Sequence, residues 1–569
     1  MTESQSRKVA KSQRMESPRP LRLCDFEPLR LVLALTIMTL TSCATTPPPQ
    51  PLDLKITNGR ILDGTGSPWF RGDVGVRGDV IVAVGDLSGT PAKSTIDAGN
   101  RIVSPGFIDL LGWSQTSVIS DPDLESKVRQ GVTTEIAGEG VSPGPRRPER
   151  VTKDEPWATL GDFLDQLDRQ GSAVNFALLV GASNPREMVI GDINRVPTAD
   201  EMKQMEAIVD QAMRDGAIGI STSLIYVPAM FSSTEEIINL ARVAAKYDGM
   251  YFSHIRDEGD AIDGALDEAF RIGREANIPV NIWHLKLGGR TNWGRMPAVI
   301  ARIAAARAEG LDVSANVYPY AASSTGLSTL APDWAMEGGY DDFRKRLENP
   351  EDRAKIAEAF RAQYAKRGPR GIYVIQIQNP AHDPYEKKFI EEIAASMGVT
   401  VEEALIALFQ GSTISPRVIF FSMNEDDVQY ALKTPWVSVG SDASAPSAKM
   451  RAENTAVHPR AYGSFPRVIG HYARDQKLFS LEEAVRKITS QAALRAHIFD
   501  RGLVREGMKA DIVIFDPETV RDPSTFADPH HFSEGITDVI VNGVPVLRDS
   551  AMTGARPGRT IRGKGYVKN

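Results

Sequence analysis

Three polar residues stand at the ends of short apolar runs in the middle of the chain. His254 ends the run that begins at residue 249, His284 ends the run from 278, and Asp442 ends the run from 436. Where such strands are parallel neighbours in a barrel, their C-terminal ends meet at one face, so these side chains would converge. Two imidazoles and a carboxylate at one place can bind a divalent cation such as Zn²⁺. A lone histidine at a strand end is more often an ordinary hydrogen-bonded residue, and spacing alone leaves both interpretations open.

A second carboxylate, Glu139, follows another apolar run and lies between Gly138 and Gly140. Glycine lets the backbone approach a ligand closely, which makes Glu139 a candidate metal ligand. The alternative is an ordinary loop glutamate. Glu135, inside the preceding run, is the competing carboxylate.

Four further polar residues follow predicted strands: Lys286, Tyr318, Ser324 and Arg460. Arginine offers a planar fork to a carboxylate and lysine offers a point charge, so Lys286 and Arg460 could hold an acidic group of a substrate. The hydroxyls of Tyr318 and Ser324 could donate hydrogen bonds at the same place. The alternative is that both cations are surface charges, as most lysines and arginines are.

The elements that must bring these residues together alternate between strands and helices. Helices are predicted over residues 199–214, 234–246, 260–276 and 296–308. The candidate strands are 102–109, 132–137, 175–181, 217–221, 249–254, 280–284, 312–317 and 436–441. Repeated strand–helix alternation gives a parallel sheet with crossover helices. The pattern predicts an α/β fold, a (β/α)8 TIM barrel, within a domain of residues 105–499.

The segments that flank the barrel have a different, strand-rich pattern. Residues 52–104 and 500–560 hold short apolar alternations separated by turns such as Asn58-Gly59. This pattern predicts a small β-sandwich built from both termini. Residues 335–410, in contrast, are mostly helical in pattern and form a predicted insertion before the last barrel strand. Such an insertion could act as a lid or as a structural brace.

The N-terminal region has the pattern of a secretory signal. A basic flank precedes the apolar run 31–40, and Leu40-Thr41-Ser42-Cys43 resembles a bacterial lipobox. We expect residues 1–42 to be a lipoprotein-type signal peptide, Cys43 to carry the lipid, and the proline-rich residues 43–51 to be a tether. This predicts a periplasm-facing lipoprotein of the bacterial cell envelope, in the outer membrane, with the lipid as its one membrane attachment. A plain cleaved signal and a short buried helix are the alternatives.

The composition is that of an ordinary globular protein, since 42% of the 569 residues are hydrophobic and 24% are charged. Of the two cysteines, Cys24 lies within the predicted signal, so we expect no disulfide after cleavage. The sequence has no Lys/Arg-rich block, which argues against a nucleic-acid partner. The sequence pattern makes no prediction of oligomeric state.

Several strings in the chain are shared with a known enzyme family. They include Pro105 to Asp109, Gly131 to Thr134, His254 to Gly259 and, most specifically, His458 to Arg467. From about residue 53 to 558 the chain resembles the D-aminoacylase, or N-acyl-D-amino-acid deacylase, family of the amidohydrolase superfamily. The resemblance implies a TIM barrel with a small β-sandwich and an insertion, and an enzyme that cleaves linear amide bonds.

The resemblance also implies a zinc site. The family holds its tightly bound zinc with two histidines and a cysteine, which carry over onto His254, His284 and the loop after the second strand. That loop here reads Gly138-Glu139-Gly140, and a loop one residue shorter would put Glu139 at the cysteine position. A carboxylate is a competent zinc ligand, so the resemblance implies zinc held by Glu139, His254 and His284.

The other functional positions of the family carry over with one departure. Its weaker second metal needs a His-x-His pair, and Leu111 and Trp113 stand at those positions, so one zinc ion is expected. Its general acid/base carries over onto Asp442. Its contacts with the substrate carboxylate carry over onto the four polar residues named above: Lys286, Tyr318, Ser324 and Arg460.

These implications together predict a zinc-dependent hydrolase of N-acyl amino acids, with N-acyl-D-amino acids as the expected substrates. Zinc would lower the pKa of a bound water to about 7, and Asp442 would move a proton to the leaving amine. The first alternative is a hydrolase of another amide, a dipeptide or a lactone on the same scaffold. The second is a non-catalytic, ligand-binding envelope lipoprotein.

Overall fold

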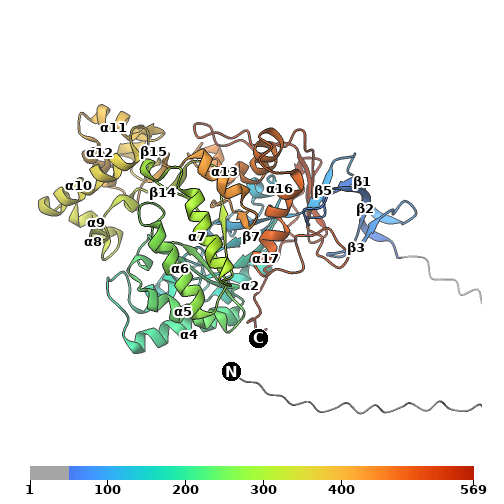
Figure 1. The fold of residues 1–569 in the computed structure, drawn as a ribbon, viewed down its shortest axis with the longest axis horizontal. Coiled ribbons are helices and arrows are strands. Elements are labelled where there is room, and N and C mark those ends of the chain that lie inside the picture. The colour runs from blue at the N-terminus through green and yellow to red at the C-terminus, as the bar shows by residue number, and fades with distance from the viewer. Residues whose placement is uncertain (1–49, 569) are drawn as a thin grey trace, which may run out of the picture. The chain divides into compact units, whose positions relative to one another are not determined.

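The computed structural model describes residues 50–568, and the predicted signal, Cys43 and most of the tether lie outside them. Three parts follow one another along the horizontal axis of Figure 1: a β-sheet at one end, a barrel, and an insertion at the other end. The candidate site residues belong to the barrel and to the segments next to the insertion.

Eight parallel strand positions form the barrel. They are β6 (Phe107–Gly112), β7 (Val132–Ala137), β8 (Asn175–Leu178) continued by β9 (Val180–Gly181), β10 (Gly219–Ser223), β11 (Met250–His254), β12 (Val280–Ile282), β13 (Val313–Val317) and β18 (Val437–Val439). They pair as two parallel arcs, β6-β7-β8 and β18-β13-β12-β11-β10-β9. Leu179 alone separates β8 from β9, and Gly112 bridges Ala443 just after β18, so the arcs join into a ring. The predicted TIM-barrel-type α/β fold is confirmed.

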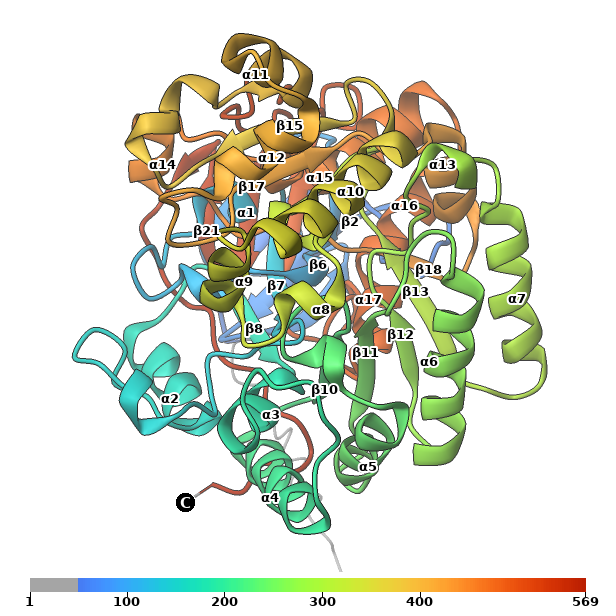
Figure 2. The same cartoon turned by 90° about the vertical axis from the view of Figure 1, so that its left-hand side faces the viewer.

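Helices cover the outside of the barrel. They include α2 (Leu160–Gln170), α3 (Ser183–Val189), α4 (Ala199–Asp215), α5 (Thr234–Ala245), α6 (Ile262–Ala276), α7 (Met296–Ala308), α13 (Glu425–Lys433), α16 (Leu481–Ile488) and α17 (Ser490–Arg495). Figure 2 shows α4 to α7 outside the strands β10 to β13. Local sequence sets their ends: Thr198 accepts a hydrogen bond from the main-chain nitrogen of Glu201, and the Glu201 side chain bonds back to Thr198. Met202, Met205 and Val209 then form the buried face of α4.

The predicted first strand, 102–109, is two strands in the structure. β5 (Ile102–Pro105) pairs with β1 (Leu52–Ile61) and with β19 (Ile512–Phe515) outside the barrel, and β6 begins after Gly106. A Cβ atom on Gly106 would lie 2.7 Å from the Cβ of Thr133 on β7, closer than real Cβ atoms approach. Glycine is therefore needed where the chain passes from the terminal sheet into the barrel.

The two ends of the described chain share one sheet. Its other strands are β2 (Phe70–Arg77), β3 (Val80–Gly85), β4 (Ala92–Asp97), β20 (Ile536–Val541), β21 (Val544–Arg548) and β22 (Ala551–Met552). The order is β22-β21-β20-β19-β5-β1-β2-β3, with β4 also paired to β1. The antiparallel pair β5–β19 joins the N-terminal strands to the C-terminal ones. This pairing does not test the two-layered sandwich, which stays a prediction.

The insertion between β13 and β18 contains the predicted helices and also a sheet. The helices are α8 (Asp333–Met336), α9 (Tyr340–Arg346), α10 (Pro350–Arg367), α11 (Ile390–Met397) and α12 (Val401–Phe409). The strands β14 (Ser323–Gly326), β15 (Ile372–Gln376), β16 (Lys388–Phe389) and β17 (Arg417–Phe420) pair antiparallel in the order β14-β17-β15-β16. The predicted bounds 335–410 are therefore too narrow, because β14 and β17 lie outside them. β14 reads Ser-Ser-Thr-Gly and carries no apolar alternation to mark it.

The insertion has an apolar core of its own. Phe343, Phe360 and Phe409 pack together with Val418 and Phe420 of β17, in a cluster separate from that of the barrel. A segment with its own core can hold a fixed shape at the end of the barrel where the candidate site lies.

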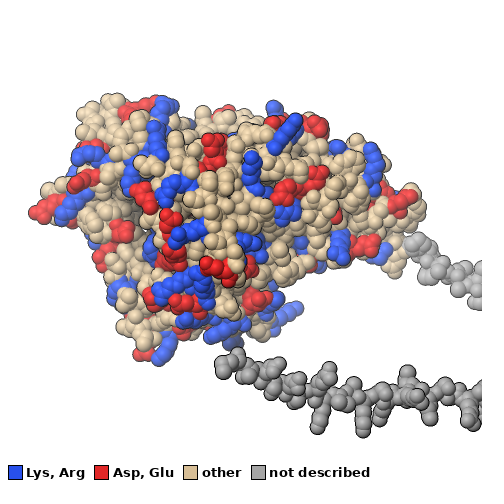
Figure 3. All heavy atoms as spheres, in the orientation of Figure 1, with Lys and Arg blue, Asp and Glu red and all other residues tan. Residues whose placement is uncertain are grey.

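Charges of both signs are interspersed over the face seen in Figure 3. Many belong to ion pairs between helices, such as Arg361 with Glu402 at 2.6 Å and Arg271 with Glu235 at 2.8 Å. Exposed pairs of this kind contribute about 0–1 kcal/mol each. Within residues 50–568, the structure has no helix of the length and apolar character needed to cross a bilayer.

Candidate metal centre and active site

Glu139, His254 and His284 meet at the C-terminal end of the barrel. Glu139 Oε1 lies 2.8 Å from His254 Nδ1 and 3.1 Å from His284 Nε2, and the two nitrogens are 3.1 Å apart. All three side chains are buried. They come from the loop after β7, the last residue of β11 and the loop after β12. In the described part of the chain, this is the one group of three or more His, Cys, Asp or Glu side chains with converging ligand atoms.

The donor atoms of this cluster fit a zinc ion. Two ligands bound to tetrahedral zinc at their usual bond lengths are about 3.3 Å apart, close to the separations seen here. Two imidazole nitrogens and one carboxylate oxygen are also a known donor set for catalytic zinc. The residues that would hold the metal are therefore Glu139, His254 and His284.

The backbone around the cluster adopts φ angles that residues with a side chain rarely adopt. His284 has a φ of 36°, and its main-chain nitrogen donates a 2.6 Å hydrogen bond to Asn316 Oδ1 on the neighbouring strand β13. Gly140 has a φ of 64°, and a Cβ there would lie 2.9 Å from the main-chain nitrogen of Ser223. Residues held in such conformations are concentrated at functional sites.

Glu258 is a member of the site that sequence reasoning missed. Its carboxylate lies 2.9 Å from His284 Nδ1 and 3.4 Å from His254 Nε2, and it forms an ion pair with Lys286. It therefore contacts the nitrogen of each imidazole that faces away from Glu139. Carboxylates in this position orient metal-binding histidines. The available signal was the spacing His-x-x-x-Glu directly after the end of a strand.

The site stabilises positive charge. Burial opposes ionisation of Glu139, but the charges and hydrogen bonds of His284 and His254 lower its pKa far below the ordinary value. Burial likewise opposes ionisation of Glu258, whose pKa is held well below normal by His254, Lys286 and His284. For His284, burial and Lys286 lower the pKa, but Glu258 and Glu139 outweigh them and raise it to about 9. Both carboxylates are thus ionised at neutral pH and favour a cation between them.

Asp442, the predicted acid/base, lies beside the cluster and is paired with Arg460. Its Oδ2 is 2.8 Å from Arg460 Nη1, and its φ of 50° is supported by a 2.8 Å hydrogen bond from its main-chain nitrogen to the carbonyl of Leu111. The Arg460 guanidinium lies 4.7 Å from the centre of the Tyr318 ring, and its Nη2 donates to the main-chain carbonyl of Ser324 at 3.2 Å. Ser324 thus contributes its carbonyl here, and the role predicted for its hydroxyl stays a prediction.

The other predicted substrate contacts lie around the same aromatic ring. Lys286 Nζ is 5.7 Å from the Tyr318 ring centre and 2.7 Å from His284 Nδ1. The Tyr318 hydroxyl lies 3.5 Å from Met423 Sδ. The structure therefore brings Lys286, Tyr318 and Arg460 together with the main chain of Ser324, next to the metal cluster.

The comparisons with known proteins agree with this geometry. The family model for amidohydrolases matches residues 94–547, most of the chain. The chain belongs to the amidohydrolase family.

Two curated relatives of this amidohydrolase match over nearly their whole length. The D-aminoacylase of Alcaligenes xylosoxydans xylosoxydans is 36% identical over 90% of this chain and 98% of its own. The N-acyl-D-glutamate deacylase of the same organism is also 36% identical, over 90% of this chain and 97% of its own. Among solved structures, N-acyl-D-glutamate deacylase from Bordetella bronchiseptica, complexed with zinc and a phosphonate mimic of the tetrahedral intermediate, matches with a TM-score of 0.77. It is 34% identical and covers 90% of this chain and 100% of its own. The predicted resemblance is confirmed.

Trp113 links the metal cluster of this amidohydrolase to Asp442. Its indole Nε1 donates to Glu139 Oε2 at 3.0 Å and to Asp442 Oδ1 at 3.2 Å. Leu111, at the other position of the missing His-x-His pair, is fully buried in an apolar cluster. The sequence marked Trp113 only as a missing ligand, and its contacts with both carboxylates depend on the closed barrel.

Glu135, the competing carboxylate, belongs to a separate buried cluster. It lies 3.2 Å from Lys127 Nζ and accepts a 2.6 Å hydrogen bond from the main-chain nitrogen of Ser114. Lys127 also pairs with Asp109 at 2.6 Å. Because a buried ammonium compensates these carboxylates, Glu135 is not a ligand of the Glu139 cluster, and that alternative is wrong.

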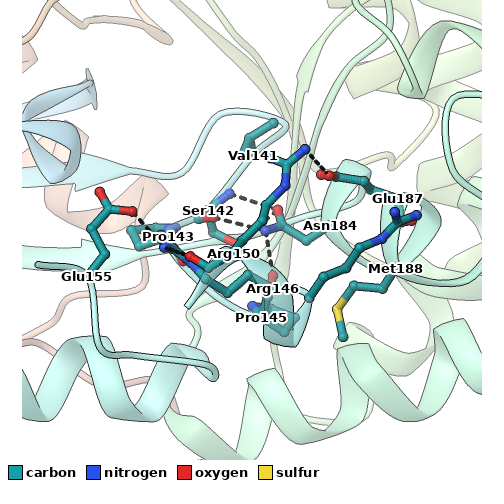
Figure 4. A pocket seen from close by; sticks show the side chains of 11 residues that line it. Val141, Ser142, Pro143, Pro145, Arg146, Arg150, Glu155, Asn184, Glu187 and Met188 are labelled. Atoms are coloured by element: carbon teal, nitrogen blue, oxygen red, sulfur yellow. Dashed lines mark hydrogen bonds and ion pairs between the residues drawn. The ribbon is translucent and has the colours of Figure 1, made fainter. Parts of the chain in front are cut away.

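A hollow of about 290 Å³ lies next to the loop that follows Glu139. Three arginines line it, Arg146, Arg147 and Arg150, and Figure 4 labels the first and the last of them. Arg146 pairs with Glu155 at 2.7 Å, Arg150 pairs with Glu187 at 2.5 Å, and Arg147 donates to the Glu187 carbonyl. Arg147 also lies 3.9 Å from Glu149 Oε1, so each arginine has a carboxylate nearby and the hollow offers an incoming anion little net attraction.

Proposed function

We propose that this amidohydrolase hydrolyses the amide bond of N-acyl-D-amino acids with one zinc ion. The observation that carries the proposal is the convergence of Glu139, His254 and His284 with Asp442 beside them. The relatives that match over nearly their full length support it, because their names state D-aminoacylase and N-acyl-D-glutamate deacylase activities.

Zinc held by Glu139, His254 and His284 would supply a Lewis acid and an activated water at neutral pH. Asp442 would accept a proton as the amide carbonyl is attacked and deliver it to the nitrogen of the leaving amine. Its left-handed backbone conformation and its bond to Trp113 keep the carboxylate in one place, which favours a short proton path.

Arg460 and Lys286 would hold the α-carboxylate of the amino acid. Arg460 is the better placed, because the α-carboxylate is one carbon away from the scissile nitrogen and Arg460 contacts Asp442 directly. With the carboxylate and the amide both fixed, the two enantiomers direct their side chains to different places, so the surrounding wall would decide which enantiomer fits. The Tyr318 ring and the Ser324 segment would form the wall beside this pair.

One ion rather than two is proposed because of Trp113. Glu139 Oε2 and Asp442 Oδ1 both accept from the same indole N–H, so the space between them holds a neutral donor. An indole N–H donates but cannot ligate a metal, and Leu111 offers no donor atom. A second cation would therefore lack the ligands that a His-x-His pair would provide.

The test combines metal content with turnover. The purified protein should contain about one zinc per chain and hydrolyse N-acetyl-D-amino acids in preference to the L-enantiomers. Glu139→Ala and His254→Ala should lose both bound zinc and activity. Full activity in a metal-free preparation would contradict the proposal.

We also propose that the chain is an envelope lipoprotein anchored through Cys43, facing the periplasm from the outer membrane. The support is the signal pattern of residues 1–42 and the lipobox-like Leu40 to Cys43. Expression in a bacterial host with a labelled fatty acid should label the wild-type chain but not Cys43→Ala. An unlabelled wild-type chain would contradict the anchor without affecting the catalytic proposal.

A further inference from the structure

Arg417, the first residue of β17, carries a guanidinium for which residues 50–568 provide no hydrogen bond or ion pair. Its basic neighbours near the site differ in this respect. Lys286 pairs with Glu258, and Arg460 pairs with Asp442 and with the Ser324 carbonyl. Unlike Lys286 and Arg460, Arg417 therefore has guanidinium N–H groups that can donate hydrogen bonds to a ligand.

The register of β17 directs the Arg417 side chain toward the active-site loops. Successive side chains of a strand point to opposite faces. Val418 and Phe420 enter the core of the insertion, whereas Ile419 packs against Ala322 and Ala456. Because Arg417 and Ile419 share a face, Arg417 lies on the side of Ala322 and Ala456. These two residues belong to the segments that carry Tyr318 and Arg460.

The opposite strand, β14, connects the neighbourhood of Arg417 to the metal cluster. Arg417 pairs with Gly326, the last residue of β14. The preceding residue of β14, Thr325, bonds through Oγ1 to the hydroxyl of Tyr226 at 2.7 Å, and the Tyr226 ring stacks edge-on against His254 with centres 5.4 Å apart. One chain of contacts thus runs from the neighbourhood of Arg417 to a metal ligand.

The Arg417 side chain is exposed and also lies close to charged groups of the site. Its side chain is exposed to solvent, although protein atoms surround it closely enough for burial to lower its pKa. Tyr226 and Asp442 oppose that shift, and Arg460 adds to it. Arg417 therefore feels the charges of the site without contacting them, and it keeps its positive charge at neutral pH.

We propose that Arg417 binds a second carboxylate of the substrate, so that N-acyl-D-amino acids with an acidic side chain are preferred. This inference rests on the proposed function. The α-carboxylate must lie next to Asp442, where Arg460 is, and the side-chain carboxyl carbon of aspartate or glutamate is two or three bonds from Cα. Arg417 lies close to Asp442 but, unlike Arg460, does not contact it, and so matches that more distant position. The two named relatives are equally similar overall, so a residue of the site must decide the preference.

The physical basis of the preference is the pairing of a partly desolvated guanidinium. An acidic side chain can form a bidentate, charge-assisted pair with it, and an amide of the same shape cannot neutralise it. Hydrogen bonds between charged groups contribute about 1.5–3 kcal/mol, which corresponds to about 10- to 100-fold in kcat/KM.

The experiment compares N-acetyl-D-glutamate with the isosteric N-acetyl-D-glutamine in the zinc-loaded, full-length protein. The wild type should prefer the glutamate by about tenfold or more in kcat/KM. Arg417→Ala should reduce this ratio toward one, mainly by raising KM for the glutamate, and Arg417→Lys should restore part of it. Arg361→Ala, which removes an exposed arginine of α10 paired with Glu402, should leave the ratio unchanged.

Three outcomes would overturn the inference. If the wild type cleaves N-acetyl-D-glutamine and N-acetyl-D-glutamate equally well, the inference about Arg417 is refuted and the proposed function is unaffected. Equal losses for both substrates in Arg417→Ala, with unchanged thermal unfolding, would show that Arg417 serves the α-carboxylate instead. A zinc-loaded wild type that cleaves neither these substrates nor N-acetyl-D-leucine would refute the proposed function and this inference with it.

Discussion

Among single residues of the site, Trp113 bridges two groups with proposed functions. One indole N–H serves two carboxylates, Glu139 and Asp442, that lie far apart in the sequence and close together in the barrel. Two nearby carboxylates repel each other, and a shared donor reduces that repulsion without adding a charge. The side chain thereby couples the proposed metal ligand to the proposed acid/base.

Replacing Trp113 with phenylalanine should therefore remove the hydrogen-bonded link between Glu139 and Asp442. The ring remains, but Glu139 and Asp442 lose a donor, so we expect kcat to fall about 10- to 100-fold with a smaller change in KM. Steady-state kinetics on an N-acetyl-D-amino acid measures this effect. Trp69→Phe, which alters a partly exposed tryptophan remote in sequence from the site, is the control. An unchanged kcat would show that the shared hydrogen bond has no catalytic role.

Glu258 should determine how tightly zinc is held. Its carboxylate contacts both imidazoles and Lys286, so Glu258→Gln removes a charge that orients the two histidines. Loss of such a contact typically weakens metal affinity about 10- to 100-fold. Competition with a chelating dye gives the zinc Kd of wild type and variant. Glu235→Gln, on the exposed side of α5, should bind zinc as the wild type does.

At the scale of elements, the join between the terminal sheet and the barrel depends on one close approach. β5 and β6 read as a continuous apolar run, yet they belong to different sheets. The backbone at Gly106 passes so close to Thr133 that no side chain fits between them. The sequence run cannot reveal this contact, because it involves the neighbouring strand β7.

Gly106→Ala should destabilise the protein by about 1–3 kcal/mol or more, because the new methyl group would overlap the Thr133 side chain. Urea unfolding measures the change. The double variant Gly106→Ala with Thr133→Gly should recover part of the loss, since it removes the atoms that clash. Gly89→Ala, where an added Cβ meets nothing within 4 Å, is the control. Equal stability of the Gly106 variant and the wild type would contradict the close approach.

The insertion differs from its prediction for a related reason. Its helices follow from local periodicity, but β14 pairs with β17, which lies about 90 residues later in the chain. A polar segment such as Ser323 to Gly326 becomes a strand only because a partner strand lies beside it. That pairing also places Arg417 on the side of the active-site loops.

At the scale of the whole molecule, a buried lysine links the last barrel strand to the outer helices. Lys487 of α16 donates to the carbonyls of Thr434 and Val437 at 2.6 and 3.0 Å. Burial lowers its pKa to about 8, and the nearby Glu483 opposes that shift only partly. The charged form is therefore less favourable in the folded protein than in the unfolded chain.

This lysine should make stability depend on pH. Between about pH 8 and pH 10.4 the unfolded chain holds the Lys487 proton that the folded protein has released, so the contribution of Lys487 to stability rises with pH. Below pH 8 both states are protonated and the burial cost is constant. Relative to Lys487→Met, the wild type should gain up to about 3 kcal/mol across that window. Urea unfolding at several pH values measures the gain. A difference in unfolding free energy between wild type and variant that stays constant with pH would contradict it. Tyrosines that titrate in the same range are present in both proteins and cancel.

The sequence by itself determined the alternation of strands and helices in the barrel and the positions of the chemically competent residues at strand ends. These features follow from local sterics and from the spacing of apolar residues, which act within a few residues of each other. The barrel type and the family follow from the same local strings, and His254, His284 and Glu139 could be named before their distances were known.

Only the tertiary structure decided which side chains meet. The two acceptors of Trp113, the contacts of Glu258 with both imidazoles, and the direction of Arg417 all depend on strands that are distant in the chain. Ring closure of the barrel sets those distances, and no local pattern encodes a distance between residues hundreds of positions apart. The proposed metal ligands can therefore be named from the sequence, while the geometry that brings them together arises from packing.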